Sequence, residues 1–393
     1  MWQIIKMKNI LLAFLLIAFN NVLKAQSINI GAELSDDIIT RYQPTINTMT
    51  GKGWDHSNSI ILHGIEKIYL KDKDARYLEY IKKFVDEFVD ENGVITDLKP
   101  ELDRIQPGVL CLFLYEETGE LKYKYAATQL KNYVLNSSLF KTTPEGGFWH
   151  KNNDHYNGVM TIDGAYMLSP FLIKYGTLFH DSLSIETAIN QTLLIASKTF
   201  NIETNLPYHG WDSNKNKEWA NPITGTSTEI WSRSIGWFSM ALIDILEYLP
   251  SSHKDYAKIL YLYQHLSNGI KEHQHSNGMW YQLLMRNSMV DNYPETSGSG
   301  MIIYALKKGI SKGFLDEGYI EIVDKGWMAL KTFVKFSSDG SMIVNSFCPG
   351  MGIQKSAIDY LAVRPVSSPS TEEKQQPHGY CAVLMAASVM KTK

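Results

Sequence analysis

Apolar residues recur at intervals of three and four along most of the chain, and strict alternation of apolar and polar residues is rare. Intervals of three and four are typical of amphipathic helices, so the pattern predicts an all-α protein. The predicted helices cover residues 32–46, 57–70, 75–90, 104–118, 121–138, 162–179, 182–200, 230–249, 254–273, 295–313, 316–336 and 376–391.

Several predicted helices form pairs joined by short polar turns, as in YLKDKDARYLEY and EETGELKYKYA. Repeated pairs of this kind are typical of stacked helical hairpins, although the sequence identity between the pairs is weak. Twelve helices in six hairpins would close into an (α/α)6 barrel. An open solenoid is the structural alternative.

Four connections between the predicted helices are long, over residues 142–162, 201–229, 276–294 and 337–376. The first three are rich in glycine, tryptophan, histidine and asparagine, and connections of this length are usually functional. In a helical barrel we expect such loops to build a site at one rim. The last connection includes RPVSSPSTEEKQQP, residues 364–377, which we expect to be a surface or mobile segment.

The first residues differ from the rest of the chain. Lys6 and Lys8 precede the apolar run ILLAFLLIAF, residues 10–19, which is too short to span a bilayer and is followed by a small alanine. This pattern predicts a secretory signal peptide at residues 1–25, a single barrel domain at 26–393, and periplasmic or secreted localisation. An N-terminal anchor is the alternative.

Composition narrows the possible partners. Hydrophobic residues make up 44% of the 393 residues and the formal net charge is −3, so we expect a packed core and no nucleic-acid partner. Aromatic residues, at 12%, suit stacking on sugar rings but suit an ordinary core equally well. Of the 3 cysteines, Cys111 and Cys381 lie in apolar runs and read as buried, and their spacing fits neither a disulfide framework nor a zinc site.

Three segments together resemble glycoside hydrolase family 105, the unsaturated rhamnogalacturonyl hydrolases and their relatives. They are WDHSNSIILHGIEKIY at 54–69, GGFWHK at 146–151 followed by IDGAYM, and LPYHGWDSNKNKEWANPITGTSTEIWSRSIGWFSMALIDILEYLP at 206–250. The resemblance runs from about residue 35 to the C-terminus and implies an (α/α)6 barrel. It also implies a hydrolase that removes the unsaturated uronate from oligosaccharides made by a polysaccharide lyase, with rhamnogalacturonan as the first choice.

Two aspartates are candidate catalytic residues. Asp163 precedes an apolar helical stretch, so the local pattern alone favours a helix N-cap, whereas the resemblance implies the catalytic acid/base. Asp103, in ELDRIQPGVL, also reads as a cap, and the resemblance implies a second acid that assists the first. We expect the charge of Asp103 to keep the pKa of Asp163 high, against the opposing helix dipole.

An arginine and a tryptophan on one helix face are candidate substrate ligands. Arg233 and Trp237 are four residues apart, so the guanidinium could grip a uronate carboxylate while the indole stacks on the sugar. Trp231 reaches the site if it lies in the non-helical cap. A surface ion pair and a core tryptophan are the alternative, and the resemblance implies substrate contact for all three.

Histidines in the long loops complete the candidate site. A lone histidine is more often structural, but the resemblance makes His150 and His209 plausible donors to sugar hydroxyls or to the carboxylate. No pair among His150, His155, His209 and His378 has the spacing of metal ligands, so we expect neither a metal nor another cofactor.

Departures from the family leave the substrate open. Thr161 stands where the family often has tryptophan, and the loop between His150 and Asp163 is slightly long. Ulvan-type or other rhamnose–uronate glycans are therefore the second choice of substrate. Two other functions remain open: an inverting glycosidase with Asp212 or Glu229 as a second acid, and a non-catalytic glycan-binding protein of the cell envelope.

Overall fold

The computed structural model describes residues 29–136, 138–370 and 375–391. The predicted signal peptide lies outside the described residues, as does part of the segment 364–377 that we expected to be a surface or mobile segment. No helix in the described part of the chain combines the length and apolarity needed to cross a membrane.

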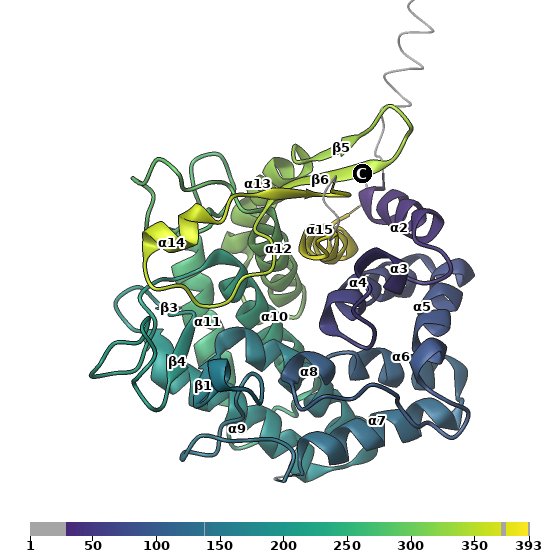
Figure 1. Ribbon diagram of the computed structural model, residues 1–393. Helices are drawn as coiled ribbons and strands as arrows, with labels where there is room; N and C mark the ends of the chain where they lie inside the picture. Colours follow the sequence, from purple (N-terminus) through teal and green to yellow (C-terminus); the bar gives the residue numbers. More distant parts are fainter. Residues whose placement is uncertain (1–28, 137, 371–374, 392–393) are drawn as a thin grey trace, which may run out of the picture.

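Two concentric rings of helices make up the described fold (Figure 1). Each inner helix packs against the next, and the last packs against the first, so the ring is closed. The inner helices are α4 (His56–Asp72), α6 (Gly108–Thr118), α8 (Ile162–Phe179), α10 (Ser232–Tyr248), α12 (Thr296–Ser311) and α15 (His378–Val389). The outer helices are α2 (Ile30–Arg41), α5 (Ala75–Phe88), α7 (Leu121–Val134), α9 (Ser182–Thr199), α11 (Tyr256–Glu272) and α13 (Ile320–Lys331). The predicted (α/α)6 barrel is confirmed.

The barrel closes through the two ends of the chain. Five inner helices pair with the outer helix that follows them in the sequence, but α15 pairs with α2, the first helix. Close packing of the inner ring depends on small residues: a Cβ added at Gly300 of α12 would lie 2.5 Å from the Ala382 carbonyl oxygen of α15. The inner helices are surrounded on all sides, which explains why α8 is apolar and buried almost throughout.

All twelve predicted helices are confirmed, and four of them have ends shifted by four residues or more. The helix expected over 121–138 ends at Val134. The helix expected over 32–46 ends at Arg41. The helix expected from residue 104 begins at Gly108, after Pro107, and is preceded by a 3-10 turn over Leu102–Arg104. The helix expected over 316–336 is α13, shorter at both ends, and residues 334–336 form a strand.

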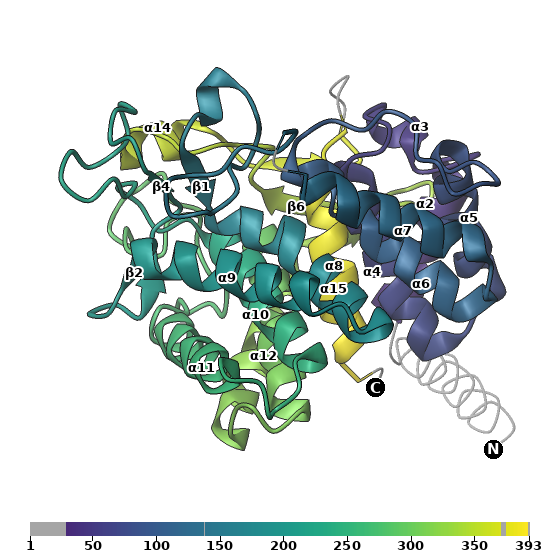
Figure 2. The ribbon, with the colours of Figure 1, turned by 90° about the horizontal axis from the view of Figure 1, so that it is seen from below.

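Short strands in the long connections are the main feature that periodicity missed. Strands of two to six residues are too short, or too irregular, for alternation to be recognised. They are β1 (Val159–Thr161) paired with β4 (Gly210–Asp212), β2 (Phe200–Asn201) paired with β3 (Leu206–Pro207), and the antiparallel sheet of β5 (Val334–Phe336), β6 (Met342–Phe347) and β7 (Val366–Ser368). Figure 2 shows β1, β4, β6 and the short helix α14 (Ala357–Ala362) gathered at one end of the barrel.

Ion pairs fill the other end of the barrel. Near the C-terminal ends of α10 and α12, Lys308 Nζ lies 2.7 Å from carboxylate oxygens of both Asp244 and Glu247. The free-energy cost of burying these charged groups is offset by the attraction between their opposite charges. The end formed by the N-termini of the inner helices is therefore the one left for a binding site.

Candidate active site

Most of the candidate side chains lie at the N-terminal ends of inner helices. His56 and His378 are the first residues of α4 and α15, Asp163 and Arg233 lie in the first turns of α8 and α10, and Trp231 is the N-cap of α10. Outer helices carry the chain back between them, so all inner helices begin at the same rim. Helix N-termini carry partial positive charge, which makes this rim favourable for an anion.

Asp163 is not the cap of its helix. The cap is Thr161, whose Oγ1 accepts a hydrogen bond from the Gly164 amide at 3.1 Å, so the N-cap interpretation of Asp163 is wrong. The carboxyl is 15% exposed, and its Oδ2 lies 3.2 Å from His209 Nε2. Its Oδ1 is buried and is held by no basic side chain or backbone amide of the described residues; the hydroxyl of Ser234 is the neighbouring group that can hydrogen-bond to this carboxyl.

The protonation of Asp163 differs from our expectation. Burial alone would raise the pKa of this carboxyl, but the nearby His209, which also hydrogen-bonds to it, outweighs burial. The pKa of Asp163 therefore lies below its usual value, and the expectation of a pKa kept high is wrong. In its place, the structure pairs the acid with an imidazole that can hold a proton beside it.

Asp103 forms the centre of a second charged cluster. Its carboxylate, 4% exposed, lies 2.6 Å from Lys151 Nζ, 3.3 Å from His150 Nε2 and 3.6 Å from His56 Nδ1. Burial alone would raise the pKa of Asp103, but these basic groups hold it well below its usual value. Because Pro107 occupies the N-cap of α6, the cap interpretation of Asp103 is also wrong.

His150 joins the two aspartates. Its Nε2 faces Asp103, and its Nδ1 lies 3.0 Å from Thr161 Oγ1, the group that caps the helix carrying Asp163. Thr161, the residue that departs from the family pattern, thus has a structural role at the start of α8. The arrangement brings the sequence-predicted His150, Asp103 and Asp163 to one part of the rim.

Arg233 is buried against the backbone of the last long connection. Its Nη1 and Nη2 donate to the carbonyls of Cys348 and Pro349, and its Cζ lies 4.3 Å from the centre of the Trp231 ring. The side chain is 1% exposed and forms no ion pair with any described residue. A buried cation of this kind favours an anionic ligand, although two of its nitrogens already donate to backbone carbonyls.

The two tryptophans of α10 have different surroundings. Trp231, in the non-helical cap as expected, has its ring 4.8 Å from that of His209, and its Nε1 is buried without a partner among the described residues. Trp237 stacks on Tyr166 of α8 at 4.8 Å. Trp231 therefore borders the acid, whereas Trp237 links two inner helices.

The two acids that an inverting glycosidase could use are already engaged. Asp212 is fully buried and accepts hydrogen bonds from the amides of Asn214, Asn216 and Lys217 at 2.7 to 2.9 Å. Glu229 accepts hydrogen bonds from Arg286 Nη2 and Nε, at 2.7 and 2.9 Å. Both carboxylates stabilise loops, which leaves Asp163 as the candidate acid with an oxygen that no basic side chain or backbone amide holds.

Several residues of the site were missed from the sequence. Lys151 directly follows His150, and a cation beside a candidate ligand in GGFWHK was a usable signal. His56 stands inside the quoted segment WDHSNS but looked like an ordinary helix start. Tyr360, whose hydroxyl lies 2.7 Å from His209 Nδ1, had no local signal because the contact spans 151 residues. The Nδ1 of His378 is buried without a partner among the described residues.

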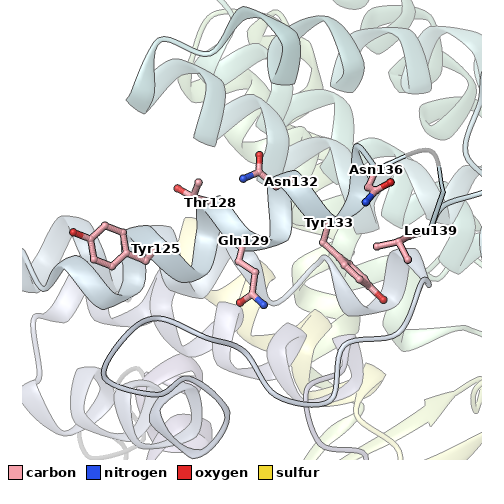
Figure 3. A pocket seen from close by; sticks show the side chains of 7 residues that line it. All are labelled: Tyr125, Thr128, Gln129, Asn132, Tyr133, Asn136 and Leu139. Atoms are coloured by element: carbon pink, nitrogen blue, oxygen red, sulfur yellow. The ribbon is translucent and has the colours of Figure 1, made fainter.

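A groove on the outer helix α7 lacks this chemistry. It measures about 520 Å³ and is lined by Tyr125, Thr128, Gln129, Asn132, Tyr133, Asn136 and Leu139 (Figure 3). None of these side chains is a carboxylate, an imidazole or a cation, so the groove lacks the acid and the basic groups that are found together at the rim. The chemistry of the described chain is concentrated at the barrel rim.

Comparisons with known proteins agree with this site and fold. The model of Glycosyl Hydrolase Family 88 matches residues 32–392. A solved glycoside hydrolase from family 105 of C. acetobutylicum is 30% identical, with a TM-score of 0.83, over 91% of this chain and 98% of that one. Unsaturated rhamnogalacturonyl hydrolase YesR of Bacillus subtilis is 24% identical over 79% of this chain and 83% of its own length.

Another relative has a higher sequence identity over a shorter stretch of this chain. Protein Atu3128 of Agrobacterium fabrum is 37% identical over 146 residues, which is 37% of this chain and 62% of that protein. The match thus spans less than two thirds of the Agrobacterium protein. With the family model covering nearly the whole described chain, the protein belongs to the glycosyl hydrolases of family 88, and its resemblance to family 105 is confirmed.

Proposed function

We propose that the protein removes the unsaturated uronate from the non-reducing end of oligosaccharides made by a polysaccharide lyase. The observation that carries this proposal is that, among the described candidate acids, Asp163 alone keeps an oxygen held by no backbone amide or basic side chain, whereas Asp103, Asp212 and Glu229 are all held by such groups. An ordinary glycosidase needs two carboxylates across the scissile bond. Hydration of a double bond needs one.

The proposed reaction adds water across the C4=C5 double bond. The Asp163 carboxyl, paired with His209, delivers a proton to C4, the electrons of the double bond form the new C–H bond, and oxocarbenium character develops at C5. Water then attacks C5 and returns a proton to the carboxyl. The resulting hemiketal opens and releases the rest of the oligosaccharide, so the net change consumes one water molecule and regenerates Asp163.

The charge of the rim suits the carboxylate of such a substrate. Lys151 and Arg233 supply cations, and the N-termini of the inner helices add partial positive charge. We propose that Arg233 and Lys151 attract the uronate carboxylate while Trp231, His150 and His209 border the sugar. Relatives that act on rhamnogalacturonan support this glycan as the first choice of substrate.

A second substrate class is favoured by one observation. Thr161 replaces the tryptophan that the family often has, and its hydroxyl is used by His150 and by the start of α8. The wall of the site beside the scissile region therefore differs in size and polarity. We propose ulvan-type or other rhamnose–uronate glycans as the alternative.

One experiment separates the open functions. The protein is incubated with lyase-generated and with saturated oligosaccharides, the ultraviolet absorbance of the conjugated double bond is followed, and released sugar is assayed. We expect absorbance to fall with the lyase products alone. Release from the saturated sugars would identify an ordinary glycosidase, and binding without release from either would identify a glycan-binding protein.

We also propose that the protein is exported to the periplasm or secreted. Support comes from the lysines and the short apolar run within residues 1–25. Mass spectrometry of the native protein is expected to find a chain that starts near Gln26. An intact Met1 would remove this proposal.

A further inference from the structure

Tyr360 connects the last long connection to the catalytic acid. It lies in α14, is fully buried, and packs in a small cluster with Trp231, Leu283 and Cys348. Its hydroxyl oxygen lies 2.7 Å from His209 Nδ1, and the other ring nitrogen of His209 lies 3.2 Å from Asp163 Oδ2. Three side chains from distant parts of the sequence therefore form one line of hydrogen bonds.

The line of hydrogen bonds fixes which nitrogen of His209 carries the proton. When Asp163 is ionised, Nε2 must donate to its carboxylate, so the neutral ring has to accept a hydrogen bond at Nδ1. The phenol of Tyr360 donates that bond. When the ring takes a second proton, Nδ1 becomes a donor and the same phenol oxygen can accept from it.

The phenol itself stays protonated. Burial raises the pKa of Tyr360, and the nearby carboxylates of Asp163 and Glu229 raise it further. Other ionisable groups face the line from neighbouring segments: His150 faces Asp163, and Glu229 faces Tyr360 but is paired with Arg286. Along this line, only the carboxyl of Asp163 and the imidazole of His209 therefore exchange protons.

We propose that Tyr360 is a positioning residue for the reaction: its hydroxyl holds the His209 imidazole in line with Asp163, so that carboxyl and imidazole share the proton delivered to the substrate. This proposal rests on the proposed hydration reaction. In the donor step the O–H bond of Asp163 breaks and the C4–H bond forms. After water attacks C5, its proton returns to the same pair.

The test compares Tyr360→Phe with Tyr263→Phe. Tyr263 is equally buried, and its hydroxyl donates to the Ala305 carbonyl at 2.8 Å, in the body of the barrel. Both variants lose one buried hydrogen bond, so both are expected to lower the thermal midpoint. Only Tyr360→Phe is expected to lower kcat, by about tenfold, and to move the alkaline limb of kcat against pH by about one unit toward acid, with little change in KM.

The direction of the shift follows from the charged imidazole. A protonated ring has two N–H donors, and phenylalanine removes the acceptor of one of them, so the pair releases its proton at lower pH. A Tyr360→Phe enzyme whose kcat and pH profile match those of Tyr263→Phe would overturn the proposal. So would a change confined to KM.

A second measurement needs neither substrate nor a Tyr360 variant. The nitrogen chemical shifts of His209 in the wild-type protein, assigned by comparison with His209→Gln, report which ring nitrogen carries the proton. Above the alkaline limb we expect the Nε2–H tautomer, and a predominant Nδ1–H tautomer would overturn the proposal. If wild type hydrates no lyase-generated oligosaccharide, the proposed function fails, and the tautomer still decides the role of Tyr360 at His209.

Discussion

Replacing Asp103 with asparagine removes one buried negative charge and keeps the size of the side chain. The carboxylate is 4% exposed and faces Lys151 at 2.6 Å and His150 at 3.3 Å. Asparagine can still form hydrogen bonds to these groups but cannot neutralise them. The variant therefore measures what the charge contributes, both to folding and to the shape of the rim.

The size of the effect follows from the exposure of the partners. Removing one partner of a fully buried ion pair costs about 3–5 kcal/mol. Lys151 is 26% exposed, so water screens part of the charge that is left behind. We expect the free energy of unfolding to fall by about 2–3 kcal/mol at neutral pH.

The pH dependence has a defined sign. The pKa of Asp103 is held well below its usual value in the folded protein, so its contribution to stability is fully present above the usual pKa of an aspartate. That contribution is lost as the pH falls toward the folded-state pKa. The difference between wild type and Asp103→Asn should therefore be fully present at about pH 5 and shrink below about pH 4.

The assay is denaturant unfolding followed by circular dichroism at several pH values, with Asp97→Asn as the matched control. Asp97 lies on the same loop, is 48% exposed, and forms only long contacts of 3.5 and 3.9 Å with Arg104 and Lys99. Its replacement should cost about 1 kcal/mol or less. A difference for Asp103→Asn that is as small as that of the control, or that does not shrink in acid, would refute the buried-charge argument.

Four further predictions concern activity. Asp163→Asn should lower kcat by about a thousandfold or more while circular dichroism stays unchanged, since the amide has no acidic proton to transfer. Asp103→Asn should move the alkaline limb of kcat against pH toward acid, because a negative charge leaves the rim; an unmoved limb would show that the two carboxyls are not coupled. Arg233→Lys should lower kcat/KM by about tenfold or more, because a point charge cannot replace the planar fork of donors that we propose for the uronate carboxylate, and unchanged kinetics would make Arg233 merely structural. Activity should persist in a chelator; loss that a divalent ion restores would contradict the prediction of a metal-free site.

Periodicity was sufficient for the helices because the spacing of apolar residues is a local property. All twelve barrel helices were predicted, and the errors were in their ends, in the short strands and in the short helices α3 (Asn47–Thr50) and α14, which were missed. The candidate site was also largely predicted: Asp163, Asp103 and His150 lie together at the rim, and Trp231 lies in the cap of α10. Asp163, Asp103 and Trp231 each fall next to a predicted helix start, and His150 lies in a long connection that was expected to build the rim.

Only the tertiary structure decided how these groups act on one another. Closure of the barrel through α2 and α15 brings together the two ends of the chain, which no local pattern records. His209, not Asp103, sets the direction of the pKa of Asp163, and Tyr360 reaches His209 across 151 residues. A pKa depends on burial and on the nearest charges, and both are fixed by which distant side chains the closed ring brings within a few ångströms.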